Sequence, residues 1–266
     1  MSLKTADRAI DALQRRDLKQ AANLFDQCRK KLSQPNHRQA CAVTYFKVGR
    51  YSDAQAMLKK LIRQVNITPQ IMSLSGDINK ATGKLDAAVK DYRQAVTMAP
   101  QAPELHYNLA LALFAKANIV EAKTALECAL KHRPDYVKAL VLLGRCLTAI
   151  EQFDDAEQSF TKAIKIEPNN YLPHYRLGRL HVYKGNTAKA AESLGASLER
   201  NQQLMPAQEA LILNSIYSGE RQTAAALIEA SLTMAPNNES IIAIATDWAI
   251  ENKQDNPYHY YDKAWQ

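Results

Sequence analysis

Two histidines and two neighbouring aspartates are the first candidates for a metal site or a catalytic site in this sequence. His174 and His181 are seven residues apart, which places them on one helical face where they could present two ligands to a metal ion. Asp154 and Asp155 could form an acid–base pair. The histidines, however, fall at positions that a helical repeat uses for packing, and the aspartates fall at a helix start, where acids favour the helix dipole. We therefore expect packing and capping roles, with no metal site and no catalytic site.

Other signatures of enzymes and cofactor sites are missing from the sequence. No glycine-rich phosphate loop, GxSxG motif or HExxH motif occurs. The four cysteines form no CxxC pair and no short metal-binding spacing: Cys28, Cys41, Cys128 and Cys146. Each falls at a helical position where a small apolar residue would pack, so we expect reduced core thiols. The sequence predicts a protein that is not an enzyme and needs no cofactor.

Positive charge is concentrated near the N-terminus. The chain has a formal charge of +7, and residues 1–66 hold 14 basic and 5 acidic side chains. Such a region can attract RNA, an anionic membrane or an acidic partner. Most of these cations fall late in expected helices, where they complement the helix dipole, so we favour solvated helix ends over a nucleic-acid site.

Hydropathy favours a cytoplasmic protein with no membrane insertion. The N-terminus has no apolar stretch of signal-peptide length, and no run of 18 apolar residues occurs anywhere in the chain.

Prolines reveal the repeat that must position all of these side chains. Pro100, Pro134, Pro168 and Pro236 are separated by 34, 34 and 68 residues, and a period of about 34 is typical of helix–turn–helix repeats. We number each unit so that these prolines occupy position 32. The sequence then predicts units at about 2–34, 35–68, 69–102, 103–136, 137–170, 171–204 and 205–237, with an incomplete or capping unit at 238–266.

Other residue types fall into columns of this frame. Position 20 is alanine in all seven units: Ala21, Ala54, Ala88, Ala122, Ala156, Ala190 and Ala224. Position 24 is large and apolar: Phe25, Leu58, Tyr92, Leu126, Phe160, Leu194 and Ile228. Seven of the eight glycines stand at position 8 (Gly76, Gly144, Gly178) or position 15 (Gly49, Gly83, Gly185, Gly219). Small residues at 8 and 20 allow two antiparallel helices to approach closely, and glycine at 15 supplies a left-handed residue that ends the first helix.

The C-terminal residues are expected to form an eighth, atypical unit. A start at Asn238 puts Ile241 and Trp248 in packing positions and Asn252 at the helix-ending position 15, where asparagine tolerates the left-handed conformation. Residues 253–266 are predicted to be helical and to cover the apolar edge of the seventh unit, as a terminal cap does in a solenoid. The unit is incomplete at Gln266, so it is either a natural cap or a cut.

These columns resemble the tetratricopeptide repeat (TPR) family, whose pattern has a large residue at position 4, Leu, Gly and Tyr at positions 7, 8 and 11, and Ala, Phe, Ala and Pro at 20, 24, 27 and 32. The unit from Val137 matches nearly the whole pattern: Leu140, Leu143, Gly144, Leu147, Ala156, Phe160, Ala163 and Pro168. The pattern is broken at Arg8, Ser197 and Gln202. The resemblance implies an all-α fold, a right-handed superhelical solenoid of antiparallel helix-turn-helix hairpins forming a single domain over residues 1–266. It also implies a non-catalytic scaffold or adaptor that binds proteins or peptides.

In this family, positions 2, 5, 6, 9, 12 and 13 of each first helix line a concave groove, and we call them the groove positions. The residues expected to bind a peptide there are Tyr107, Asn108, Lys138, Arg145, Tyr175, Arg176, Arg179, Tyr183 and Tyr217. Asp77, Glu104 and Glu209 are the nearby groove acids. Because arginine forks onto carboxylates and tyrosine offers flat apolar area, we expect a protein or peptide partner with an acidic or carboxylate-bearing segment. A merely solvated inner face remains the alternative.

One TPR subfamily clamps the C-terminal carboxylate of chaperone tails with five residues on three successive first helices. Asn108 and Lys138 match two of these five. Ser73, Asp77 and Leu142 replace the other three, so we do not expect chaperone-tail binding.

Two other functions stay open. Bacterial TPR arrays often precede sulfotransferase, glycosyltransferase or oxygenase domains, so the chain could be the N-terminal section of a longer enzyme. The basic N-terminal units could instead bind RNA, which would show as a steep salt dependence. The partner's identity and the oligomeric state are not predicted.

Overall fold

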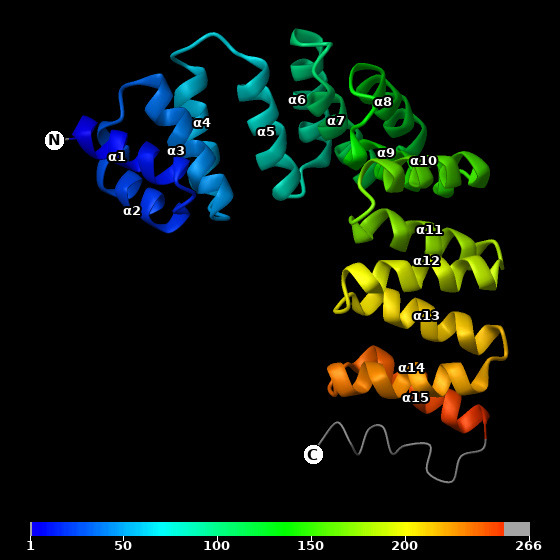
Figure 1. Ribbon diagram of the computed structural model, residues 1–266. Coiled ribbons are helices and arrows are strands. Elements are labelled where there is room, and N and C mark those ends of the chain that lie inside the picture. The colour runs from blue at the N-terminus through cyan, green and yellow to red at the C-terminus, as the bar shows by residue number, and fades with distance from the viewer. Residues whose placement is uncertain (1, 253–266) are drawn as a thin grey trace. The chain divides into compact units, whose positions relative to one another are not determined.

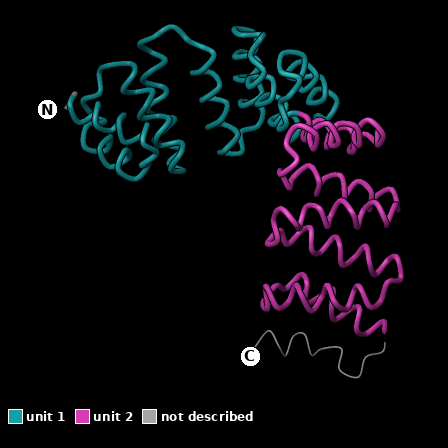
Figure 2. Tube along the Cα trace, viewed as in Figure 1, with its two compact units in different colours: residues 1–139 teal, residues 140–266 magenta. Residues whose placement is uncertain are grey.

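The computed structural model describes residues 2–252, and all regular structure in that range is helical (Figure 1). The predicted all-α fold is therefore confirmed. The chain divides into two compact units, residues 1–139 and 140–266, with the boundary inside helix α9 (Figure 2). The predicted capping helix at residues 253–266 lies outside the described residues.

Unit 1 is a stack of four helical hairpins. Its first helices are α1 (Ser2–Gln14), α3 (Pro35–Lys47), α5 (Pro69–Ala81) and α7 (Pro103–Ala115). The second helices are α2 (Leu18–Cys28), α4 (Tyr51–Ile62), α6 (Leu85–Met98) and α8 (Ile119–His132), and the 3-10 turn η1 (Arg29–Lys31) follows α2. Each of α2, α4 and α6 also contacts the next first helix, so these hairpins stack in chain order.

Unit 2 continues the same pattern. Its helices are α9 (Val137–Ala149), α10 (Phe153–Ile166), α11 (Tyr171–Tyr183), α12 (Thr187–Arg200), α13 (Met205–Tyr217), α14 (Arg221–Met234) and α15 (Glu239–Glu251). The first helices α11, α13 and α15 contact one another in sequence, and each also packs on its neighbouring second helices. A continuous surface of first helices therefore runs through this unit.

The helices begin where proline and the repeat frame place them. Helices α3, α5 and α7 start at Pro35, Pro69 and Pro103. Proline suits the first helical turn because its missing N–H has no intrahelical partner there. Helices α11 and α13 start at Tyr171 and Met205, again at the first residue of a 34-residue unit.

Position 15 ends the first helices with a left-handed residue, as predicted. Four glycines there have φ between +71° and +79°: Gly49, Gly83, Gly185 and Gly219. Three units make the same turn without glycine, because Arg16 has φ of +63° and Ala117 and Glu151 have φ of +60°. A side chain in this conformation costs about 1–2 kcal/mol, so these three turns are imposed by the helices on either side.

Glycine at position 8 allows the two helices of a hairpin to touch. A Cβ added to Gly144 would lie 2.5 Å from Cε1 of Phe160, and one added to Gly76 would lie 2.7 Å from Cε1 of Tyr92. Phe160 and Tyr92, both at position 24, are almost completely buried. The predicted close approach of the helices is therefore confirmed.

The register of the last unit needs a correction. Helix α15 begins at Glu239, which is 34 residues after Met205, and Asn238 is its N-cap, accepting a hydrogen bond of 3.0 Å from the amide of Ile241. Asn252 has φ of −89°, outside the left-handed region. The sequence placed this unit one residue early because Asn238 was taken as the first helical residue, whereas asparagine is preferred at the cap.

Candidate peptide-binding surface

Three arginines come together on the first helices of unit 2. Arg176 and Arg179 are about one turn apart on α11. Their guanidinium carbons lie 5.3 and 6.0 Å from the ring centroid of Tyr175 on the same helix. Arg145 on α9 is close enough to act electrostatically on Arg176. We call Arg145, Arg176 and Arg179 the arginine cluster.

Arg176 is the most constrained member of the arginine cluster. Its side chain is half-buried, and its Nε is fully buried without a hydrogen-bond partner. Burial lowers the pKa of Arg176, and the charges of Arg145 and Arg179 lower it further. No carboxylate within residues 2–252 forms an ion pair with Arg176 or Arg179. Because a buried cation is stable only when it is paired, this location favours a bound anion.

Tyr175 supports the arginine cluster instead of facing outward. The sequence led us to expect a flat ring available to a ligand, but Tyr175 is only 6% exposed and packs with Leu194 and Ala207. Its hydroxyl accepts a long hydrogen bond of 3.5 Å from Nη1 of Arg179. Tyr175 is therefore a buried residue against which the guanidinium groups of Arg176 and Arg179 pack. The expectation that its ring contacts a ligand is corrected.

Tyr183 and Tyr217 are exposed at equivalent positions of α11 and α13. They are 67% and 78% exposed, and the Tyr183 ring lies 5.3 Å from the ring of Phe153 at the start of α10. Exposed aromatic rings of this kind offer contact area to a partner with little loss of side-chain freedom.

Three predicted site residues belong to unit 1 or its boundary. The Tyr107 ring is 5.2 Å from that of Tyr136, and Asn108 Nδ2 donates a hydrogen bond of 3.4 Å to Ser73 Oγ. Lys138 is exposed. These residues do not belong to unit 2, where the arginine cluster lies.

The nearby groove acid Asp77 is committed to its own hairpin. Its carboxylate accepts a hydrogen bond of 2.6 Å from the Tyr92 hydroxyl, and Lys80 Nζ lies 3.9 Å away. Burial raises the pKa of Asp77.

The two histidines are buried, and the two aspartates lie at the start of α10. His174 is buried with Nε2 3.1 Å from the carbonyl oxygen of Pro168, and His181 is only 3% exposed. Burial lowers the pKa of both imidazoles. Asp154 and Asp155 lie in the first turn of α10, and Asp154 pairs with Lys184 at 3.0 Å. The histidines are therefore packing residues, and Asp154 forms an ion pair with the next hairpin.

Three cysteines are buried, in line with the expected reduced core thiols. Burial raises the pKa of the Cys41 thiol to about 12 and that of Cys146 to about 11. The pKa of Cys28 is also raised by burial. Thiols of this kind are poor nucleophiles because little thiolate forms near neutral pH.

Several N-terminal cations are engaged within unit 1. Arg29 pairs with Asp53 at 3.1 Å, and Arg50 pairs with Asp26 and Asp53 at 2.7 Å each. Arg38 donates a hydrogen bond of 2.8 Å to the carbonyl oxygen of Leu32. Part of the basic charge near the N-terminus therefore holds hairpins together.

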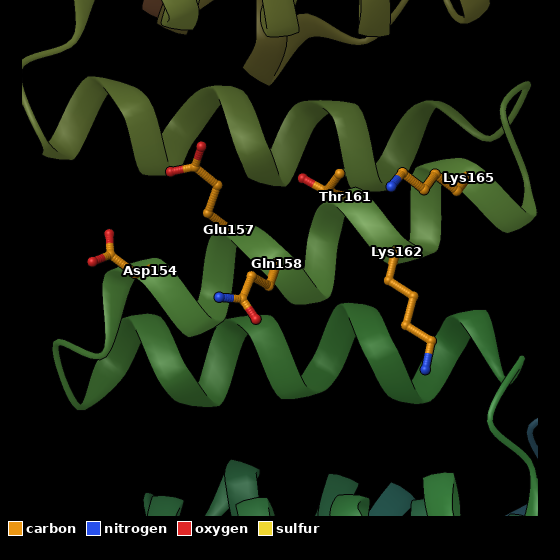
Figure 3. Close-up of a pocket in the computed structure, with 6 residues that line it drawn as sticks. All are labelled: Asp154, Glu157, Gln158, Thr161, Lys162 and Lys165. Carbon is orange, nitrogen blue, oxygen red and sulfur yellow. The ribbon is translucent and has the colours of Figure 1, made fainter.

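A polar depression of about 610 Å³ runs along α10 (Figure 3). It is lined by Asp154, Glu157, Gln158, Thr161, Lys162 and Lys165, all from this one helix. Lys184 neutralises its acidic end, at 3.0 Å from Asp154 and 3.5 Å from Glu157. The depression is on a second helix, away from the groove positions.

The sequence interpretation left out the apolar groove positions of α13. Ala210 and Leu213 stand 34 residues after Arg176 and Arg179 and are half-buried. Their position in the repeat frame was the available signal, but only charged, amide and aromatic side chains were considered as ligand contacts.

None of the described helices is both long enough and apolar enough to cross a membrane.

Stacked helical hairpins with a 34-residue period define a helical-repeat protein of the protein-interaction scaffold class. The chain belongs to the tetratricopeptide repeat family. Models of this family match residues 76–116, described as a TPR repeat, and residues 107–171 and 151–212, both described as tetratricopeptide repeat.

Curated relatives share this region at low identity. The chain is 24% identical over 157 residues to Protein O-mannosyl-transferase Tmtc3 of Drosophila melanogaster, which covers 59% of this chain and 16% of that protein. It is 28% identical over 89 residues to RNA polymerase II-associated protein 3 of Rattus norvegicus, covering 34% of this chain and 14% of that one. The chain thus spans about a sixth of the length of these relatives.

Solved structures share the fold. The C-terminal part of a TPR repeat-containing protein from Cytophaga hutchinsonii has a TM-score of 0.67 at 20% identity, covering 90% of this chain and 98% of that one. PilW, a type IV pilus biogenesis factor, has a TM-score of 0.72 at 19% identity, covering 80% and 99%. YrrB, described as a TPR protein with an unusual peptide-binding site, has a TM-score of 0.56 at 18% identity, covering 70% and 96%.

Proposed function

We propose that this scaffold binds an acidic or carboxylate-bearing segment of a protein partner at the groove positions of unit 2. The arginine cluster carries this proposal. Its central member, Arg176, has a buried Nε without a partner and a pKa lowered by burial and by two neighbouring arginines. A carboxylate bound to the accessible guanidinium nitrogens would relieve the repulsion among the arginines, and arginine can hold it through two parallel hydrogen bonds.

The fold relatives support a peptide as the form of this partner. YrrB is a TPR protein with a peptide-binding site, and its fold covers 70% of this chain. Acidic motifs recognised by arginine clusters are one of the recurring modes of peptide recognition.

The test compares the double variant Arg176→Ala/Arg179→Ala with the wild-type chain for affinity to the partner captured from source cells. Removing two charge-assisted hydrogen bonds should lower the affinity by about 30-fold or more. Lys162→Ala/Lys165→Ala is the matched control, because it removes the same charge from exposed positions of α10. The control should keep its affinity, and the wild-type interaction should be more sensitive to salt than that of the arginine variant.

The proposed site would be contradicted if the Arg176→Ala/Arg179→Ala variant binds the partner as tightly as the wild-type chain does. Equal losses in both double variants would point to general charge attraction instead of a site.

A second candidate is that the repeats are one part of a longer enzyme. The match to Protein O-mannosyl-transferase Tmtc3, of which this chain covers 16%, favours it. An immunoblot of source cells with an antibody against these repeats measures the size of the native protein. A band near 29.7 kDa, the mass of this chain, would contradict this candidate, and a much larger band would support it.

A further inference from the structure

The groove positions of unit 2 change from basic to apolar between neighbouring first helices. Position 9 is Arg179 on α11 and Leu213 on α13. Position 6 is Arg176 on α11, Ala210 on α13 and Ile244 on α15. Helix α11 contacts α13, and α13 contacts α15, so each column passes from a guanidinium group to an aliphatic side chain within one or two helix spacings.

Packing connects the basic and apolar parts of this surface. Ala210 packs against the same buried cluster as the Tyr175 ring that supports Arg176 and Arg179. Ile216 on α13 and Ile244 on α15 pack against a second shared cluster. The two parts therefore belong to one continuous face.

Large apolar side chains are exposed at the far end of this face. Tyr217, the last residue of α13, is 78% exposed, and Ile250, near the end of α15, is 47% exposed. Half-buried Leu213 lies one turn before Tyr217 on α13. Because α13 contacts α15, these side chains lie on adjacent first helices, and exposed apolar residues that gather on one face mark interaction surfaces. We call Leu213, Tyr217 and Ile250 the apolar surface.

Acidic groove positions accompany the apolar surface. Glu209 is at position 5 of α13, and Asp247 is at position 9 of α15. Their charges repel an acidic segment, whereas the arginine cluster attracts it. Charge complementarity of this kind determines which part of a charged segment lies on which part of the surface.

We infer that the partner segment is bipartite, with acidic residues on the arginine cluster and apolar residues on the apolar surface. This inference rests on the proposed function and adds the chemistry of the second half of the ligand. Packed helices lie roughly 8–10 Å apart, and an extended chain spans about 3.3 Å per residue, so about three residues should separate the two halves. The occupant is a segment of a different protein with this acidic-to-apolar pattern.

The probes are synthetic fluorescein-labelled peptides that carry Asp-Asp and Leu-Phe pairs separated by three glycine or serine residues. Both chain orders are made, because the direction of the backbone is not prescribed by side-chain chemistry. In one matched peptide the acidic pair is replaced by Asn-Asn, and in another the apolar pair is replaced by Ser-Ser. Fluorescence anisotropy with the full chain should show that one order of the complete peptide binds about tenfold or more tighter than either matched peptide.

Variants of the protein assign each half of the peptide to its surface. Tyr217→Ser/Ile250→Ser should weaken binding of the complete peptide by about fivefold or more, and should leave the Ser-Ser peptide unchanged. Arg176→Ala/Arg179→Ala should weaken both. Val120→Ser is the matched control, because Val120 is a 68% exposed apolar residue on the second helix α8. It should change no affinity.

The outcomes separate this inference from the proposed function. If the Ser-Ser peptide binds as tightly as the complete one and still depends on the arginines, acidic binding stands and the bipartite inference is overturned. If the arginine variant leaves every affinity unchanged, both are overturned.

Two other occupants of the apolar surface would also overturn the inference. Concentration-dependent self-association that Tyr217→Ser/Ile250→Ser abolishes would identify a second copy of the chain as the occupant. Tighter binding of the complete peptide after removal of residues 253–266 would identify the chain's own C-terminal segment. A monomer whose affinity is unchanged by the truncation supports the inference.

Discussion

Replacing Gly144 by alanine should destabilise the fold through one contact. The new Cβ would lie 2.5, 2.7 and 2.8 Å from three atoms of the Phe160 ring, which would have to retreat by about 0.9 Å to reach an ordinary 3.4 Å contact. Phe160 is 1% exposed and has no open side to move into. Three such contacts place the overpacking near the upper end of roughly 1–3 kcal/mol. Alanine recovers about 1 kcal/mol of helix propensity, so the net loss is about 2 kcal/mol.

A second substitution isolates this contact. The unit from Pro103 has Ala110 and Leu126 at the same two positions, and both are fully buried. Gly144→Ala/Phe160→Leu recreates that pair in the unit from Val137. The double variant should therefore be more stable than the sum of the two single substitutions predicts, with a coupling free energy of about 1 kcal/mol or more.

Thermal unfolding followed by circular dichroism measures both effects. For a chain of this size a loss of 2 kcal/mol corresponds to roughly 4–8 °C in Tm. Urea titration with two probes checks that unfolding stays cooperative, because repeat arrays can lose two-state behaviour. A Gly144→Ala variant as stable as the wild type, or additive substitutions in the double variant, would refute the steric explanation of this glycine.

Four further predictions concern the turns, the buried histidine, the C-terminus and the N-terminal charge. Glu151→Gly should raise the free energy of unfolding by about 1 kcal/mol in urea titration, because it removes a side chain from a φ of +60°. Burial holds the pKa of His181 below its usual 6.5, so the neutral imidazole contributes to the free energy of unfolding above about pH 6.5. This contribution is lost as the pH falls, because the unfolded chain takes up a proton more readily than the folded chain. His181→Gln should therefore reduce the fall in Tm at low pH. Deletion of residues 253–266 should lower Tm or cause self-association, and an unchanged monomer would contradict a capping role. Generic RNA should be retained only weakly in a filter-binding assay, because Arg29 and Arg50 are engaged in ion pairs; tight binding with a steep salt dependence would contradict this.

Backbone constraints explain which parts of the fold could be predicted. Proline at a first turn and glycine at a left-handed position act locally, so Pro69, Pro103 and Gly83 determine helix limits by themselves. The turns at Ala117 and Glu151 carry no such signal, because the hairpins on both sides impose their conformation.

The candidate site was predictable in composition but only partly in arrangement. Spacing of three residues along one helix was enough to bring Arg176 and Arg179 to the same face. The burial of Tyr175 depends on Leu194 and Ala207, which are 19 and 32 residues further along the chain. The sequence around Tyr175 does not predict contacts with such distant residues. The burial of the Arg176 Nε could not be predicted from its neighbours in the sequence either.

A ligand that binds the arginine cluster should raise the melting temperature of the protein, so the melting temperature can be used to detect that ligand. A molecule that binds the folded chain alone raises the free energy of unfolding by RT ln(1 + [L]/Kd), about 2.7 kcal/mol at a hundred times Kd. A library of anionic peptides and metabolites can therefore be screened by melting temperature alone, with no assay of biological activity. Hits whose stabilising effect disappears in Arg176→Ala/Arg179→Ala would be those that neutralise the charge gathered around Tyr175.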